Sequence, residues 1–215
     1  MSYPDPREAA AAILHFGKRL DKRQMIAAND GNLSVRIGED AILITPSGIP
    51  KGELKQEQLI TVDLQGNQKD GHGNPSSETA MHLKIYRENP HVGGVCHAHP
   101  VFATALAAAG QSMETPLLTE NIIGLGPIPL APYATPGTEE VAASIAPFLQ
   151  THQGALLANH GALAWGKDLA QAYYRLETME HTAKIHILVR FLLGTPRELT
   201  SEQLEKLAPF IGRFD

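Results

Sequence analysis

The stretch Gly93-Gly-Val-Cys-His-Ala-His99 has the composition of a short buried β-strand that ends in two histidines. Successive side chains on a strand point to opposite faces, so His97 and His99 share one face while Cys96 and Ala98 point the other way. Two imidazoles on one face have the spacing needed to bind one divalent metal ion. The pattern therefore predicts a metal site here and a core position for Cys96. The alternative, that both histidines only hydrogen-bond to the backbone, stays open from spacing alone.

A third histidine, His160, follows the apolar segment Ala155-Leu-Leu-Ala-Asn159 and precedes Gly161. The segment is typical of a buried strand, and a side chain at a strand end beside a glycine lies where a site opens to solvent. Three neutral imidazoles that leave one coordination position open form a catalytic zinc shell, so His160 is expected to join His97 and His99. The remaining histidines have no convergent partner in the sequence and are interpreted as structural or surface residues: His15, His72, His82, His91, His152, His181 and His186.

Outward from these strands, the chain mixes short strands with helices at irregular intervals. Further strands are predicted at 33–36, 41–44, 59–63 and 162–165. Helices are predicted from Asp5 through Leu20, from Thr79 to Asn89, from Val101 to Ala109, from Thr138 onward, from Leu169 to Leu193, and after a capping box at Thr200 and Gln203. This order predicts an α/β or α+β sandwich in which helices cover a central sheet. No repeat or linker interrupts the sequence, so residues 1–215 are expected to form one domain.

Composition excludes several classes of protein. The 215 residues carry 18 Lys+Arg against 23 Asp+Glu, a net charge of −5, which does not favour a basic surface for nucleic acid or anionic lipid. A hydrophobic content of 43% is enough to bury a core. The single cysteine excludes an intramolecular disulfide, and neither a signal sequence nor a membrane-length apolar run is visible. We therefore expect a cytoplasmic protein without nucleic-acid or membrane partners.

Three small polar segments have the composition of anion-binding loops. Residues 29–34 place a glycine among polar side chains just before a strand, and residues 45–48 form a Thr-Pro-Ser-Gly turn. Ser76 and Ser77 lie at the mouth of the helix predicted from Thr79, where free N–H groups and the helix dipole favour a phosphate. Local capping and turn chemistry is the more common explanation for each segment taken alone. The neighbouring Glu78 would repel phosphate, so it fits better facing a cation.

Taken together, these segments resemble the class II aldolase/adducin family, and within it most closely the L-fuculose-1-phosphate aldolases. The matching strings occur in the family order over nearly the whole chain. They are Gly31-Asn-Leu-Ser-Val-Arg36, Leu43-Ile-Thr-Pro-Ser-Gly-Ile-Pro50, Pro75-Ser-Ser-Glu78, His97-Ala-His99, Ala131-Pro-Tyr-Ala-Thr-Pro-Gly-Thr138 and Asn159-His-Gly161. The resemblance implies a three-layer αβα sandwich with a mainly antiparallel central sheet. It also implies a homotetramer with active sites between subunits.

The resemblance further implies how the site residues are used. One zinc ion per subunit, or another divalent metal, would be bound by His97, His99 and His160. Glu78 would be the fourth ligand at rest and would leave the metal to act as acid/base. The phosphate of a sugar phosphate would be held by Gly31, Asn32, Ser47, Gly48, Ser76 and Ser77. The implied reaction cleaves a ketose 1-phosphate, such as L-fuculose 1-phosphate or a 5-deoxy- or methylthio-ribulose 1-phosphate, to dihydroxyacetone phosphate and an aldehyde.

Two departures from the family pattern bear on the substrate. Thr119 or Glu120 stands where the fuculose-phosphate aldolases have a tyrosine from the adjacent subunit, and Phe210 replaces a second, C-terminal tyrosine. Glu120 instead resembles the catalytic acid/base residue of the methylthioribulose-1-phosphate dehydratases. It is therefore the second candidate catalytic residue, after Glu78. Dehydration is therefore an alternative activity, with ribulose-phosphate 4-epimerisation as a third. A non-enzymatic adducin-like module is disfavoured because all four metal-binding residues are present.

Overall fold

A computed structural model describes residues 3–212. Met1 and Ser2, which belong to the start predicted to carry no signal sequence, and residues 213–215 lie outside the described part. At its centre is an eight-stranded sheet with the order β4-β3-β2-β1-β5-β8-β7-β6. The strands are β1 Asn32–Gly38, β2 Ala41–Ile44, β3 Ile60–Asp63, β4 Gln68–Asp70, β5 Gly94–Ala98, β6 Leu130–Ala131, β7 Gly154–Leu157 and β8 Gly161–Gly166. All neighbouring pairs are antiparallel except β6 and β7.

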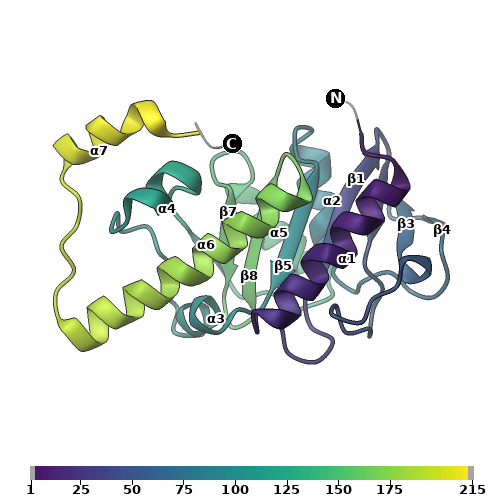
Figure 1. The fold of residues 1–215 in the computed structure, drawn as a ribbon, viewed down its shortest axis with the longest axis horizontal. Coiled ribbons are helices and arrows are strands. Elements are labelled where there is room, and N and C mark those ends of the chain that lie inside the picture. Colours follow the sequence, from purple (N-terminus) through teal and green to yellow (C-terminus); the bar gives the residue numbers. More distant parts are fainter. Residues whose placement is uncertain (1–2, 213–215) are drawn as a thin grey trace.

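Helices cover both faces of the sheet (Figure 1). On one face lie α1 Pro6–Lys22, α3 Val101–Ala108 and α6 Leu169–Ile187, and on the other lie α2 Thr79–Glu88 and α5 Glu139–Ile145. The shorter elements are α4 Thr119–Gly124, α7 Ser201–Leu207, a π-helical turn Leu188–Leu193 and 3-10 turns Gln56–Gln58, Ala146–Phe148 and Ala208–Phe210. This is the three-layer αβα sandwich with a mainly antiparallel sheet that the family resemblance implies.

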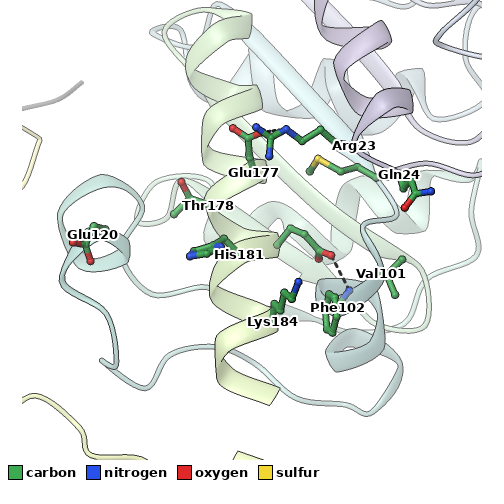
Figure 2. Close-up of a pocket in the computed structure, with 11 residues that line it drawn as sticks. Arg23, Gln24, Val101, Phe102, Glu120, Glu177, Thr178, His181 and Lys184 are labelled. Atoms are coloured by element: carbon green, nitrogen blue, oxygen red, sulfur yellow. Dashed lines mark hydrogen bonds and ion pairs between the residues drawn. The ribbon is translucent and has the colours of Figure 1, made fainter. Parts of the chain in front are cut away.

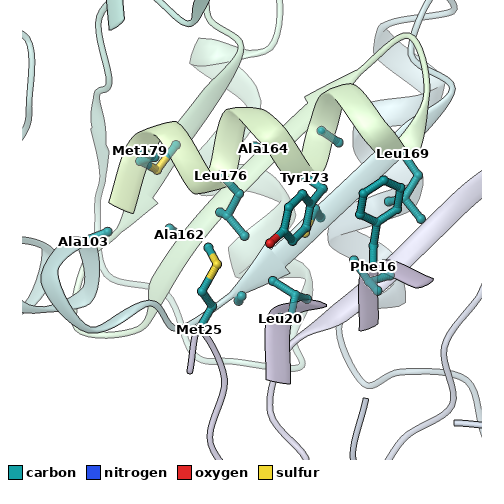
Figure 3. Close-up of a cluster of buried hydrophobic side chains, with 14 of the residues drawn as sticks. Phe16, Leu20, Met25, Ala103, Ala162, Ala164, Leu169, Tyr173, Leu176 and Met179 are labelled. Atoms are coloured by element: carbon teal, nitrogen blue, oxygen red, sulfur yellow. The ribbon is translucent and has the colours of Figure 1, made fainter. Parts of the chain in front are cut away.

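The larger apolar cluster fixes α1 and α6 against the middle of the sheet (Figure 3). Phe16 of α1 stacks on Tyr173 of α6 with ring centroids 4.9 Å apart, and the neighbouring Leu176 is fully buried. The β8 residues beneath α6, Ala162 and Ala164, are small, which lets the helix lie close to the strand. Each large buried side chain contributes roughly 1.5–3 kcal/mol to stability, so β5 and β8 are held in a rigid frame.

Cys96 belongs to the same cluster and is fully buried, as the strand alternation predicts. Burial raises the pKa of its thiol well above the usual value, which keeps it protonated and unreactive. Its neighbour His97 points to the opposite face of the sheet, where Val95 and Leu163 belong to the second apolar cluster.

The observed boundaries differ from the predicted ones where the chain turns. β7 ends at Leu157 and not at Asn159, because residues 158–160 form the hairpin loop to β8 and Asn159 has a φ of 57°. The predicted helix 169–193 is α-helical to Ile187 and π-helical beyond it. The sequence patterns missed β4, β6 and α4, which span 3, 2 and 6 residues and are too short to show a period. Within residues 3–212, no helix has the length and apolar character needed to cross a membrane.

Candidate metal and anion site

Three histidines meet where β5 ends and β8 begins. His97 lies near the end of β5, His99 follows the strand, and His160 occupies the β7–β8 hairpin. β5 and β8 run antiparallel with Ala98 opposite Ala162, which brings the two ends together. The Nε2 atoms of His97 and His99 are 3.1 Å apart, and the candidate ligand atoms of the three residues all lie within 4.8 Å of one another. Imidazoles distant in sequence therefore face one small volume.

Two glycines allow this close approach. A Cβ at Gly161 would lie 2.6 Å from Cδ2 of His99 and 2.7 Å from the carbonyl oxygen of Ala98, so no side chain fits there. Gly31 has a φ of +72°, and a Cβ on it would lie 2.8 Å from the carbonyl oxygen of His97. A glycine is therefore needed on both sides of the strand that carries His97. Gly161 is needed for space alone, and Gly31 is needed both for space and for its backbone conformation.

Glu78 places its carboxylate against these imidazoles from the N-terminus of α2. Its Oε2 lies 3.0 Å from Nε2 of His97, and its Oε1 lies 3.3 Å from Nε2 of His160. Asn32 donates a 2.8 Å hydrogen bond to Oε2, whereas the buried Oε1 has no hydrogen-bond donor among the described residues. Burial would raise the pKa of Glu78, but His97, His160 and Asn32 together hold it well below its usual value. The carboxylate is therefore ionised and buried.

This donor set fits a divalent cation. For zinc with bonds of about 2.0–2.1 Å to four ligands, neighbouring ligand atoms are roughly 3.3 Å apart, close to the separations of 3.0, 3.1 and 3.3 Å between the ligand atoms. The other ring nitrogen of His97 donates to the carbonyl oxygen of Ala162 at 3.0 Å, and that of His99 lies 3.2 Å from Asp30. Such outer contacts are typical of metal-binding histidines, because they aim the Nε2 lone pair at the ion. A cation would also satisfy the orphan oxygen of Glu78.

Burial keeps two of the three imidazoles neutral. It lowers the pKa of His160 to about 4 and also lowers that of His99, with the neighbouring His97 adding to both effects. The pKa of His97 is raised, because the Glu78 carboxylate more than offsets its burial. Neutral imidazole is the form that binds metal, so His99 and His160 are ready to bind at physiological pH.

A cavity of about 230 Å³ is lined by several of the candidate metal ligands. Every residue that the sequence resemblance assigns to phosphate lines it: Gly31, Asn32, Ser47, Gly48, Ser76 and Ser77. Glu78, His99 and His160 line the same cavity, while His97 is buried behind it. The Ser76 hydroxyl accepts a 3.3 Å hydrogen bond from the backbone N–H of Glu78, so Ser76 also fixes the start of α2. Ser77 is exposed, lines the same cavity and lies beside Gly137.

Lys51 is a residue of this cavity that the sequence patterns do not single out. It is only 2% exposed, and its ammonium group donates 2.7 Å hydrogen bonds to the carbonyl oxygens of Asn29 and Ile49. These carbonyls belong to the two loops that carry Gly31 and Gly48. The buried ammonium therefore ties both loops together and adds a positive charge to the wall of an anion pocket.

Lys51 gives the protein a pH-dependent stability that a substitution should remove. Burial lowers its pKa from 10.5 to about 8, against the opposing attraction of Asp30. Between these values the unfolded chain binds more protons, so the contribution of Lys51 to the free energy of unfolding rises with pH. We expect urea unfolding to show this rise from about pH 8 to pH 9.5 in the unmodified protein and not in Lys51→Met. The same pH dependence in both proteins would contradict the assignment.

His82 is a second residue whose contacts the sequence patterns do not reveal. The helix pattern gave it no convergent partner, yet the structure buries it completely between Ser34 and Asn32 of β1. Its partners lie 48 and 50 residues away in sequence and meet it only because β1 lies beneath α2. One sequence signal could have placed His82 near the site: it lies four residues after Glu78, and residues i and i+4 share a helix face.

Glu120 lies in a different cavity of the same chain. It is exposed on α4, where its Oε2 accepts a hydrogen bond from Thr119, and it lines a cavity of about 650 Å³ (Figure 2). That cavity runs along α6 and is also lined by Glu177, His181 and Lys184. Phe210 is 42% exposed in the C-terminal 3-10 turn. Within one chain, neither residue shares the cavity of the metal ligands, so a role for either requires the neighbouring subunit that the sequence resemblance implies.

The fold, the three imidazoles that could hold a metal ion and the polar cavity beside them together point to a class of enzyme. A family model described as Class II Aldolase and Adducin N-terminal domain matches residues 11–187. The chain belongs to this family, as its sequence motifs indicate. A solved structure of L-fuculose 1-phosphate aldolase superposes with a TM-score of 0.87 at 32% identity, covering 94% of this chain and 95% of that one.

Similar proteins of the family carry out different reactions. A 3-oxo-tetronate 4-phosphate decarboxylase from Pectobacterium atrosepticum is 31% identical over 96% of this chain and 95% of its own length. A methylthioribulose-1-phosphate dehydratase from Acidiphilium cryptum is 36% identical over 80% of this chain and 86% of its own. A 5-deoxy-D-ribulose 1-phosphate aldolase from Bacillus thuringiensis is 31% identical over 91% and 92%. The sequence motifs point to aldol cleavage or dehydration and do not indicate decarboxylation.

Proposed function

We propose that this chain is a divalent-metal-dependent lyase acting on a phosphorylated keto-sugar. It breaks the bond that joins the carbon next to the carbonyl group to the following carbon. Dihydroxyacetone phosphate is one product. The observation that carries the proposal is the position of Glu78, whose carboxylate lies between the imidazoles and the cavity lined by Ser76 and Ser77. A substrate whose phosphate occupies that cavity has its carbonyl end directed toward the metal ligands.

The chain's own residues have distinct tasks in this reaction. The cavity loops bind the phosphate through hydroxyl and backbone N–H groups, and Lys51 contributes positive charge. His97, His99 and His160 would hold the metal, which when bound stabilises negative charge developing on the substrate oxygens. Glu78 moves a proton to and from the carbon that carried the broken bond. Because Glu78 is buried, bulk water has little access to the carboxylate during this proton transfer.

The first candidate reaction is aldol cleavage of a five- or six-carbon ketose 1-phosphate, including 5-deoxy or methylthio-substituted ones. Similar proteins named as L-fuculose phosphate aldolase and 5-deoxy-D-ribulose 1-phosphate aldolase support it. We propose zinc as the metal, one per subunit, a homotetramer with active sites between subunits, and a cytoplasmic location. In such an assembly Glu120 of one subunit would serve the site of its neighbour near the aldehyde oxygen.

Decarboxylation of a 3-oxo sugar acid 4-phosphate is the second candidate. Loss of carbon dioxide from the carbon next to the ketone leaves the same three-carbon enediolate. Protonation of that carbon then gives the same dihydroxyacetone phosphate. Unlike aldol cleavage, it needs no base to take the proton from a hydroxyl group, because the carboxylate has already lost its proton. The absence of the family tyrosine at Thr119 and Glu120 is compatible with this reaction, and decarboxylases are among the similar proteins.

One experiment tests what both candidates share. The metal-loaded protein is incubated with dihydroxyacetone phosphate in deuterated water, and exchange of one proton next to the carbonyl is followed by NMR. We expect stereospecific exchange of a single proton, because Glu78 faces only one side of the bound molecule. Absence of exchange contradicts the proposed function. Aldehyde or carbon dioxide release from the two substrate classes then separates the candidates.

The anion pocket makes a separate prediction. Ser77→Ala should raise KM about tenfold with little change in kcat, because the phosphate is remote from the breaking bond and its binding is uniform through the reaction. Inorganic phosphate should compete with substrate in the unmodified protein. Ser144→Ala is the matched control, since that hydroxyl lies on α5 and hydrogen-bonds to Val141 outside the pocket. A loss confined to kcat would argue against phosphate binding at Ser77.

A further inference from the structure

A buried row of polar side chains connects the interior of the protein to Glu78. Glu78, His82 and Tyr86 are four residues apart along the start and body of α2 and share one face, and Asn32 and Ser34 alternate on the facing strand β1. The contacts are Tyr86 Oη to Ser34 Oγ at 2.9 Å, Ser34 Oγ to His82 Nδ1 at 2.6 Å, His82 Nε2 to Asn32 Oδ1 at 2.5 Å and Asn32 Nδ2 to Glu78 Oε2 at 2.8 Å. All five side chains belong to one hydrogen-bonded chain.

The direction of every hydrogen bond follows from the carboxylate at the end. The ionised Glu78 carboxylate can only accept, so Asn32 presents an amide N–H to Glu78 and its carbonyl oxygen to His82. His82 must then carry its proton on Nε2. Complete burial lowers the pKa of His82 to about 3 and keeps the ring neutral, so Nδ1 accepts from the Ser34 hydroxyl. Ser34 in turn accepts from Tyr86.

We infer that His82 is a positioning residue: it fixes the Asn32 amide so that one N–H holds Glu78 and the other faces the anion cavity. With the amide rotated, the Asn32 oxygen would face the Glu78 carboxylate, which is repulsive, and the cavity would lose a donor. The backbone N–H of His82 donates to the Glu78 carbonyl as part of the helix, whereas its ring hydrogen-bonds to Asn32 and Ser34 and does not line the cavity. The ring therefore acts on the Glu78 carboxylate through Asn32. The catalytic part of this inference rests on the proposed function, in which Glu78 moves the proton.

The tautomer of His82 tests the inference without any reaction. In ¹⁵N-labelled protein, the imidazole nitrogen shifts and couplings of His82 should show a neutral ring with the proton on Nε2 at neutral pH. A proton on Nδ1 would require Asn32 to donate to His82 and turn its oxygen to Glu78, which overturns the inference. A doubly protonated ring overturns it as well. This measurement uses the unmodified protein and does not depend on a variant folding.

Two substitutions by amide side chains, each of which matches one ring nitrogen of His82, test the same role in catalysis. The amide nitrogen of His82→Gln reaches the place of Nε2 and can still donate to Asn32, whereas that of His82→Asn reaches only the place of Nδ1. Both remove the ring from the core. We expect His82→Gln to retain most of the deuterium exchange and His82→Asn to lose about 10- to 100-fold, as for a lost hydrogen bond that supports a charged group. Equal losses in the two variants contradict the inference.

A double-mutant comparison separates positioning from core packing. If His82 acts through Asn32, then His82→Asn introduced into Asn32→Ala should cost less than about twofold in exchange, because the group it positions is already gone. Multiplicative losses would mean that His82 only fills the core. Thermal unfolding of each variant reports the packing effect separately. Should the unmodified protein show no exchange at all, the proposed function fails, while the tautomer still decides whether His82 orients Asn32.

Discussion

Replacing His99 or His160 with alanine should remove most of the bound divalent metal and reduce the exchange reaction to background. Each substitution deletes one of three imidazoles whose ligand atoms lie within 4.8 Å of one another and opens the site to water. Loss of groups that merely support such ligands weakens metal affinity about 10- to 100-fold, so loss of a ligand itself should cost at least as much. Metal content per chain after dialysis, measured by mass spectrometry, checks the result.

His97→Ala should have the same effect on metal and also lower stability. His97 is fully buried and donates to the carbonyl oxygen of Ala162, so its removal leaves a cavity and an unpaired acceptor. His181→Ala is the matched control, because that imidazole is exposed and lies in the cavity along α6. Normal metal content in all three variants, or equal loss in the control, would contradict the metal site.

The sequence contained enough local information to bring two of the histidines together. Strand alternation places His97 and His99 on one face whatever the rest of the chain does, and His160 lies beside a glycine at the end of an apolar strand. Their actual meeting depends on β5 and β8 being neighbours with Ala98 opposite Ala162, a long-range register that no local pattern contains. The family resemblance, which rests on motifs spread along the chain, predicted that His160 joins His97 and His99, whereas the hydrophobic period of each segment could not.

The missed residues have a common physical reason. His82 and Lys51 obtain their roles from partners that approach in the folded state, His82 from Asn32 and Ser34 on β1, and Lys51 from loop carbonyls at Asn29 and Ile49. A helical histidine and a loop lysine are ordinary residues in sequence, so burial alone distinguishes them. The interpretation of His82 as a residue without a partner was wrong for this reason.

Glu120 is the reverse case, because the sequence singles it out while the single chain places it away from the candidate site. Its sequence neighbourhood resembles that of a catalytic glutamate, but within residues 3–212 it lies on α4 in a cavity separate from that of the metal ligands. Within one chain, Glu120 therefore does not line the cavity beside His99 and His160. The catalytic role proposed for Glu120 requires the proposed assembly, and the roles of Glu78 and Glu120 can be distinguished by experiment.

Glu78→Gln should lower deuterium exchange into dihydroxyacetone phosphate by about 10²- to 10⁴-fold, the usual contribution of a general acid/base. Glutamine keeps the size of the side chain and can still accept from Asn32, but it cannot take a proton at this site. Three imidazoles remain to hold the metal, so metal content should change little. Exchange in deuterated water, measured by NMR alongside metal content, checks both expectations.

Glu120→Gln provides the contrast that identifies the reaction. In aldol cleavage it should leave exchange mostly intact and slow only the overall cleavage, because it would act at the aldehyde oxygen and not at the three-carbon fragment. In decarboxylation it should affect neither exchange nor carbon dioxide release. In dehydration the order reverses: Glu120 is essential, and the unmodified protein releases a dehydrated diketo product without forming dihydroxyacetone phosphate. Full exchange in Glu78→Gln would remove Glu78 from the chemistry, since no exposed group could replace a carboxylate buried between His97 and His160.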